Sequence, residues 1–422
     1  MSVTRLDTPF LDGGIRSTNF FNGRLLSRED MQREQDAERA VHERLGRALD
    51  AGIVRGFEVE ARSIGGNSVT DPVVTVHAGL AVNRHGQTVA LDRDVNVSLL
   101  KPATAPTNGT TLAGSFATCL PPENAVYIVG TGVYLLSVSP ASQKQGLAVV
   151  SGLGNAAAAC NAKEVVEGVQ FRLFQVKVTA AELVDDAHLR NVVAYKFFAA
   201  DSAGAVRDPF GLAASALTLT DPPLTDCDVP LALFQWTTTG GLRWVDLWSV
   251  RRRLAQMPGT DAWPMFPDAR QDALGEAMLR QFQQHLGALR DVNALPVHAN
   301  DAFRWLPPAG LVPLGGITGA IGVDAAQFFD GFTQRGPMFI EGARVSALLR
   351  LATRFPPIRT GDPELVWLYL VRENRQPQGG VVPTQPYLLF ALGRLPCQVV
   401  PRFDVSHWDF ANYALDNERT SL

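Results

Sequence analysis

Near the N-terminus, apolar residues repeat at helical spacing but cover only a narrow strip. Ser27 and Asp30 stand at the positions of a capping box, which predicts that a helix begins at Arg28. We expect this helix to run to about residue 51, with Gly52 as the residue that ends it. The apolar positions of the stripe are Met31, Val41, Leu45 and Leu49. So narrow a stripe on a charged helix predicts light packing on the surface, or a bundle with copies of itself.

After this helix the pattern changes to runs of β-branched residues and alternation, which are typical of strands. In the first 100 residues we expect strands over 53–61, 73–77 and 95–99, and a hairpin that joins 80–82 to 88–91. Further on, we expect strands over 126–138 and 166–178, and a hairpin over 231–248. Residues 139–163 are polar and then rich in alanine, and no strand is predicted there. We expect a loop over residues 199–228.

In the last third of the chain, segments with helical spacing of apolar residues alternate with segments of strand-like pattern. We expect helices over 180–198, 267–290 and 324–332, and strands over 364–372 and 387–392. The pattern therefore predicts an α+β fold in which an N-terminal charged helix and a small all-β unit precede β-rich mixed domains. The expected segments are an N-terminal arm and helix (1–52), a small β unit (53–100), a linker (101–122), a β-rich middle domain (123–255) and a C-terminal α+β domain (256–422).

Charge is low overall and unevenly placed. Charged residues form 19% of the 422 residues, below the usual share of about 25%. Twelve of them lie between residues 28 and 50, whereas residues 102–122 hold none. We therefore expect unexplained apolar surface on the loops and sheets rather than on the charged helix face. A net charge of -4 and a pI near 6.0 lack the electrostatic footprint of a dedicated nucleic-acid binder.

Targeting signals and cysteine spacing indicate the cellular compartment in which the chain is made and whether its cysteines are reduced. The N-terminus has no basic and apolar signal segment, so we expect synthesis in the cytoplasm without a signal peptide. Residues 125–140 are apolar but interrupted by glycines, so we expect no membrane insertion. The cysteines are far apart and form no CxxC, so we expect reduced, partly buried thiols; they are Cys119, Cys160, Cys227 and Cys397.

Motifs for chemistry are sparse. Gly152, Gly154 and Ala157 satisfy GxGxxA, but no βαβ pattern surrounds them, so a small-residue loop is the favoured interpretation over a dinucleotide site. The seven histidines show no HxH or HExxH spacing, and no P-loop or nucleophile elbow occurs. We therefore expect no catalytic residue, metal or cofactor. The adjacent acids at 185–186 suit a helix start.

Tryptophans gather near one predicted hairpin: Trp236, Trp244 and Trp248. Trp244 and Trp248 are an even number of residues apart, so we expect them on the same side of their strand. An exposed set would stack on sugar rings, whereas a buried sheet face is the favoured alternative. The basic run at 251–253 is expected to be a solvated edge or a contact for an acidic partner.

Several stretches together resemble a known class of proteins. They are FFNGRLLSREDM with the helix that follows it and GFEV, AGLAVNRHGQTVAL, VPLALFQWTTTGGLRWVDLWSVRRRL and FRWLPPAGLVP. In these stretches the chain resembles uncharacterised structural proteins of extracellular contractile injection systems, which are phage-tail-like particles. Phe57 departs from the pattern, which has leucine there. The resemblance implies a baseplate, cap-adaptor or fibre-attachment component. It further implies many copies in a symmetric assembly and sheath, tube, baseplate or fibre proteins as partners.

We therefore expect a non-enzymatic protein that assembles through two segments. In the first, Asn22 and Gly23 form a tight turn that presents Phe20, Phe21 and Arg24. The second is the loop at 303–313, with Arg304 and Trp305. One alternative is that the phenylalanines only pack the helix against its own domain. Two other functions stay open: a glycan- or surface-binding module, and a hydrolase with dispersed carboxylates.

Overall fold

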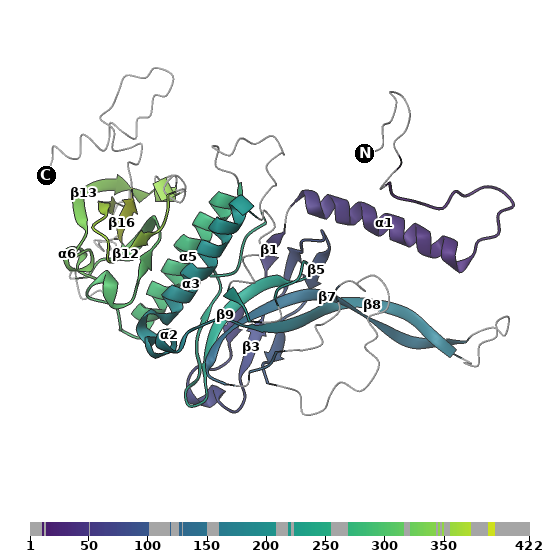
Figure 1. Ribbon diagram of the computed structural model, residues 1–422, viewed down its shortest axis with the longest axis horizontal. Coiled ribbons are helices and arrows are strands. Elements are labelled where there is room, and N and C mark those ends of the chain that lie inside the picture. Colours follow the sequence, from purple (N-terminus) through teal and green to yellow (C-terminus); the bar gives the residue numbers. More distant parts are fainter. Residues whose placement is uncertain are drawn as a thin grey trace, which may run out of the picture.

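A computed structural model of the chain places helices and sheets in an α+β arrangement, which confirms the predicted fold class (Figure 1). It describes residues 11–392 except 12–13, 50, 101–118, 120–125, 129, 150–159, 208–217, 221–222, 255–268, 316–320, 343–344, 347, 350–354 and 373–386. The GxGxxA segment and almost all of the predicted linker lie outside the described residues.

The charged N-terminal helix forms as predicted at its start. Helix α1 spans Arg28–Ala48, and both bonds of the capping box between Ser27 and Asp30 are present. Its end differs from the prediction, because Leu49 is the C-cap and Gly52 is the first residue of strand β1. Gly52 packs so closely on Leu254 that a Cβ would lie 2.8 Å from the Leu254 nitrogen. The glycine therefore serves a strand contact rather than the end of the helix.

The small β unit forms two three-stranded sheets. Their strands are β1 (Gly52–Gly56), β4 (Gly79–Val82) and β5 (Thr88–Leu91) in one sheet, and β2 (Val59–Ala61), β3 (Val73–Val76) and β6 (Val95–Ser98) in the other. The predicted β4–β5 hairpin is confirmed. The prediction of one strand over 53–61 is wrong.

The break between β1 and β2 has a tertiary cause. Phe57, with φ of 58°, turns its fully buried ring into the core between the two strands. The Arg251 guanidinium donates to the carbonyls of Gly56 and Phe57, and the second bond measures 2.9 Å. Arg251 is 5% exposed, whereas the Arg253 side chain is 56% exposed, so only the end of the basic run is solvated.

The middle of the chain forms an antiparallel sheet in the order β10-β9-β7-β8. Its strands are β7 (Gly132–Val149), β8 (Cys160–Gln175), β9 (Val229–Thr237) and β10 (Gly241–Asp246). The β9–β10 hairpin is confirmed, and β7 and β8 run through much of residues 139–163, where the sequence predicted no strand. Ladder hydrogen bonds are made by the backbone, so the strands extend where the side chains give no apolar signal.

Two helices follow β8 where one helix was predicted. Helix α2 spans Ala180–Val184, and α3 spans Asp186–Arg207. Asp185 separates them with ψ of 64°, which is outside the helical range. Helix α3 runs into the predicted loop at 199–228.

The C-terminal part contains a second mixed sheet in the order β12-β16-β15-β13, in which β13 and β15 are parallel. Its elements are β12 (Ala309–Pro313), β13 (Thr333–Glu341), β15 (Leu365–Arg372) and β16 (Tyr387–Leu392), with β11 (Trp305–Leu306) and β14 (Ile358–Arg359) as a separate pair and α6 (Ala325–Phe328) between β12 and β13. The predicted strands over 364–372 and 387–392 are confirmed.

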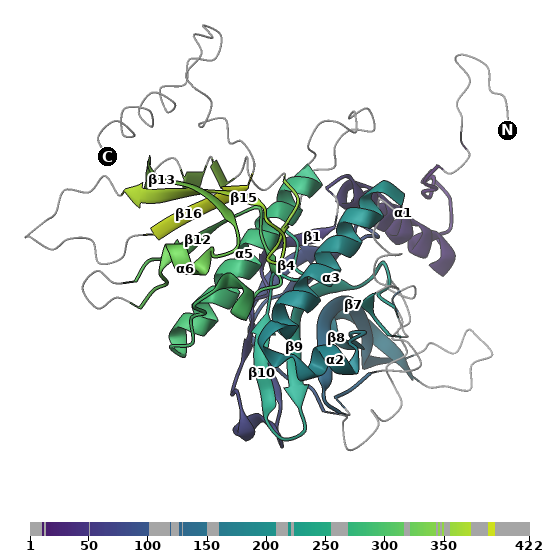
Figure 2. The same ribbon diagram turned by 60° about the vertical axis from the view of Figure 1, so that its left-hand side comes forward.

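Helices α3 and α5 (Ala269–Asp291) lie side by side between the middle sheet and the C-terminal sheet (Figures 1 and 2). One face of the middle sheet shares a core with both small sheets, and its other face packs on α3. Helix α5 buries Phe282 and Leu286 against the C-terminal sheet. The residues at 53–100 and 123–255 therefore contribute to one common core.

Candidate assembly interface

The turn at Asn22–Gly23 forms as predicted. The amide of Arg24 donates to the carbonyl of Phe21 at 3.2 Å, and Gly23 has φ of 86°. Because L side chains rarely adopt such a φ, the glycine suits this turn. Asn22 and Gly23 thus lie at the bend of the arm that precedes α1.

Polar contacts hold the arm against α1. The Arg24 guanidinium donates to the Asp30 carboxylate at 2.5 Å and to the carbonyl of Asn19 at 2.7 Å. Thr18 donates from its hydroxyl to the carbonyl of Asp30 at 2.8 Å and from its amide to Glu34 at 3.0 Å. Hydrogen bonds from Ser27, followed by the charge of Arg24, lower the pKa of Asp30. Asp30 therefore serves both as the helix cap and as the partner of Arg24.

The apolar side chains around this turn face solvent. The apolar tip, as we call it, consists of Phe20 (55% exposed), Phe21 (62%), Leu25 (93%), Leu26 (51%) and Met31 (53%). The helical stripe is exposed too: Val41 and Leu49 are 46% exposed and Leu45 is 62% exposed. The two phenylalanines are therefore only partly covered by their own chain, and the Arg24 guanidinium lies 5.8 Å from the centre of the Phe21 ring.

Helix α1 joins the rest of the chain mainly near its C-terminal end (Figure 1). A Cβ on Gly46 would lie 2.0 Å from the carbonyl oxygen of Gly86, so the helix backbone rests directly on the β4–β5 turn. Gln87 in this turn donates to the Glu43 carboxylate at 3.0 Å. Gly46, which weakens helix propensity, permits this close approach.

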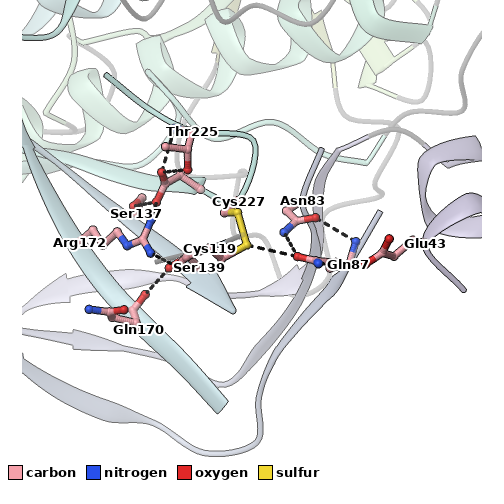
Figure 3. Close-up of a disulfide and its surroundings, with 11 residues drawn as sticks. Glu43, Asn83, Gln87, Cys119, Ser137, Ser139, Gln170, Arg172, Thr225 and Cys227 are labelled. Carbon is pink, nitrogen blue, oxygen red and sulfur yellow. Dashed lines mark hydrogen bonds and ion pairs between the residues drawn. A yellow bond between two sulfur atoms is a disulfide. The ribbon is translucent and has the colours of Figure 1, made fainter. Parts of the chain in front are cut away.

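A disulfide lies beneath this joint. Cys119 and Cys227 form it and are each 1% exposed, so the prediction of reduced thiols is wrong for this pair. The Cys119 sulfur lies 3.4 Å from Oε1 of Gln87, the residue that also contacts Glu43 (Figure 3). The amide of Arg84 in the β4–β5 turn donates to the carbonyl of Asp226, next to Cys227, so this turn lies against the entry to β9 where the two cysteines meet.

The disulfide also borders a buried ion pair (Figure 3). Arg172 of β8 donates to the Asp228 carboxylate at 3.3 Å and to the carbonyl of Cys119. Ser137 of β7 donates to Asp228 at 3.1 Å. Hydrogen bonds from neighbouring groups are what allow a buried charge pair to persist.

The second predicted segment, at 303–313, is largely committed to internal packing. The Trp305 ring stacks on Tyr195 of α3 at a centroid distance of 5.9 Å. The amides of Arg304 and Trp305 both donate to the side chain of Asn191, at 2.8 and 2.9 Å. The Arg304 side chain stays partly exposed and lies 3.5 Å from Asp185. The N-terminal arm is thus the more accessible of the two segments.

The tryptophans do not form one stacking surface. Trp236 is buried in the core with the small sheets, whereas Trp244 packs on the opposite face of the sheet. A β-bulge between Leu242 and Trp244 reverses the face on which the later residues lie. Trp248 lies beyond the end of β10, between Arg251 and Arg280, so the expectation that it shares a strand side with Trp244 is wrong.

One buried polar network was not predicted from the sequence. Asp246 of β10 is fully buried and accepts hydrogen bonds from Arg190 of α3 at 2.7 Å and from Gln281 of α5 at 3.0 Å. His285 lies one turn beyond Gln281, next to the Phe303 ring at 4.9 Å. Burial, with the nearby Arg190 charge, lowers the pKa of His285 to about 3. The sequence signal is a pair of polar residues at i,i+4 on the apolar face of α5.

Comparisons with known proteins give no assignment: no family model and no curated protein matches the chain. Within the described part of the chain, no group of three or more histidine, cysteine or acidic side chains is arranged to hold a metal ion. None of the described helices has the length and apolar character needed to cross a bilayer. The geometry of the chain itself is therefore what supports a function.

Proposed function

We propose that this chain is a structural subunit of a multi-copy, phage-tail-like contractile injection particle, and that it attaches to its neighbours through the N-terminal arm. The observation that carries the proposal is the apolar tip: five large apolar side chains, each more than half exposed, gathered at one end of a charged helix. Large exposed apolar groups that lie together mark interaction sites, whereas scattered ones need no explanation.

The way the arm is held supports the same proposal. Arg24 and Thr18 fix the arm to α1, so the tip is ordered before a partner binds. An ordered surface loses less conformational entropy on binding than a flexible segment. The buried disulfide adds support, since such bonds persist in oxidising surroundings and a released particle works in them.

Exchanging Phe20 and Phe21 for serine together should remove the chain from particles without unfolding it. Aromatic residues at the centre of an interface contribute about 2 kcal/mol or more each, so we expect occupancy to fall by roughly tenfold or more. The measurement is the amount of the chain per particle, by quantitative mass spectrometry of particles purified from cells that make either form. Deletion of residues 1–51 should give the same loss.

Val292→Ser is the matched control, because Val292 is 72% exposed but lies beyond the end of α5, far from the arm in sequence. It should leave occupancy unchanged, and both this variant and the Phe20 and Phe21 serine variant should keep the melting temperature of the wild type. Normal occupancy of the chain that lacks residues 1–51 would show that the arm is not the attachment site.

A further inference from the structure

Strands β7 and β8 form a ribbon that extends past the rest of their sheet (Figure 1). Strand β9 pairs with β7 only as far as Val138, whereas the β7–β8 ladder continues to Val149 and Cys160. The part beyond Val138 is 11 residues of β7, or about 36 Å at the rise of an extended strand. Such a two-stranded ribbon is at best marginally stable in water by itself.

Strand β8 is the edge of the sheet, and its outer half is uncovered. Residues 163–168 of β8 are all exposed, including Val165 at 47% and Val166 at 42%. Among the described residues, the one bridge on β8 outside the β7 ladder is between Val126 and Leu173, near its other end. The outer half of β8 therefore presents unpaired backbone donors and acceptors next to exposed valines.

The side chains along this edge are complementary to those of a second, antiparallel copy of the same strand. Lys163, Val165 and Glu167 alternate along β8 and so lie on one face of the ribbon. In an antiparallel pair centred on Val165, each Lys163 stands opposite Glu167 of a second copy, and Val165 stands opposite Val165. On the other face, Glu164 stands opposite Val166.

We infer that the outer half of β8 pairs antiparallel with β8 of a second copy of this chain, around a two-fold axis at Val165. The pairing gives a continuous four-stranded segment in the order β7-β8-β8-β7, in which the exposed β8 edge of each copy gains a partner strand. A two-fold contact of this kind is isologous, so it closes as a dimer and leaves the N-terminal arm of each copy available. This inference does not depend on the attachment through the arm.

The pattern of charges shows whether this edge favours pairing with a second copy or prevents pairing with other strands. Charged residues on an edge strand usually block pairing with other strands. Here the residues at i and i+4 carry opposite signs around a central valine, so reversal of the strand matches each charge with its opposite. Opposite charges directly across an antiparallel pair stabilise it, and like charges destabilise it.

The test is a set of charge reversals measured by sedimentation across a dilution series of the full chain. Lys163→Glu alone and Glu167→Lys alone should each weaken the dimer by roughly tenfold, because each places like charges opposite one another twice. An equimolar mixture of these two variants should dimerise again, since every facing pair is then opposite in sign. The double variant with both reversals should also recover dimerisation with itself.

Glu164→Lys is the matched control: it is the neighbouring exposed residue on the other face of β8, opposite an apolar valine in this register, and should change little. As a direct test of register, Val165→Cys should form a disulfide between copies on mild oxidation, whereas Val166→Cys should not. A wild-type chain that stays monomeric at every concentration overturns the inference. So does a dimer that the charge reversals leave unchanged. The Phe20 and Phe21 serine variant should dimerise normally, which keeps this test separate from that of the arm.

Discussion

Replacement of Cys119 and Cys227 by alanine should lower the free energy of unfolding by about 4–5 kcal/mol. The two cysteines are 108 residues apart, and a bond that closes so long a loop removes much of the conformational freedom of the unfolded chain. The bond also borders the Arg172–Asp228 ion pair and Gln87, so its loss should loosen the joint at which α1 meets the β4–β5 turn. Urea unfolding followed by tryptophan fluorescence measures the change.

The wild-type chain treated with a reductant should match the double variant, because both lack the same bond. Cys160→Ala is the control for loss of a cysteine outside this bond and should unfold like the wild type. Peptide mapping without reduction should recover the fragments that contain Cys119 and Cys227 as one linked species. Equal unfolding midpoints for the oxidised and reduced chains would contradict the prediction.

Acidification should destabilise the chain well above the pH at which carboxylates titrate, because of His285. Its pKa is lowered to about 3 by burial and by the charge of Arg190, with a smaller contribution from His188, while Asp246 acts in the opposite direction. The unfolded chain therefore binds a proton at this residue below pH 6.5, whereas the folded chain stays neutral until about pH 3. Stability is lost as the pH falls through this window, by up to about 1.4 kcal/mol per pH unit.

His285→Leu should remove this dependence, since leucine takes no proton and tolerates the apolar contact with Phe303. The measurement is the slope of unfolding free energy against pH between about 4.5 and 6.5. His77→Gln is the control, because hydrogen bonding to Asp94 raises the pKa of His77 and makes its contribution opposite in sign. Its contribution is present at low pH and is lost as the pH rises through the raised pKa. An unchanged slope in His285→Leu would show that another group is responsible.

The predictions for the disulfide and for His285 both concern buried contacts between different sheets and helices. The disulfide lies where the small sheets meet the middle sheet, and the Asp246 network lies where α3 and α5 meet β10. Neither contact involves the apolar tip or the outer half of β8. Variants of these surfaces can therefore be compared with the wild type without a change in the core.

The sequence by itself determined the interactions between residues that are close together along the chain. The capping box at Ser27, the turn at Asn22–Gly23 and the β4–β5 hairpin each depend on residues within a few positions of one another. The apolar period of α5 likewise identified the face that is buried. Whether Phe20 and Phe21 pack on their own domain stayed open in the sequence; their exposed fractions of 55% and 62% came from the structure.

Only the tertiary structure decided the contacts between distant residues. Cys119 meets Cys227 and Arg251 meets the carbonyl of Phe57 because separate strands converge, and no local pattern records that convergence. A single bulge sent Trp244 to the face opposite Trp236, since one extra residue reverses every later side chain. The length of the β7–β8 ribbon depended on backbone pairing between two strands whose side chains alternate weakly. Side-chain periodicity reports burial, whereas ladder hydrogen bonds require only a partner strand, so the sequence alone predicted only the inner part of this ribbon.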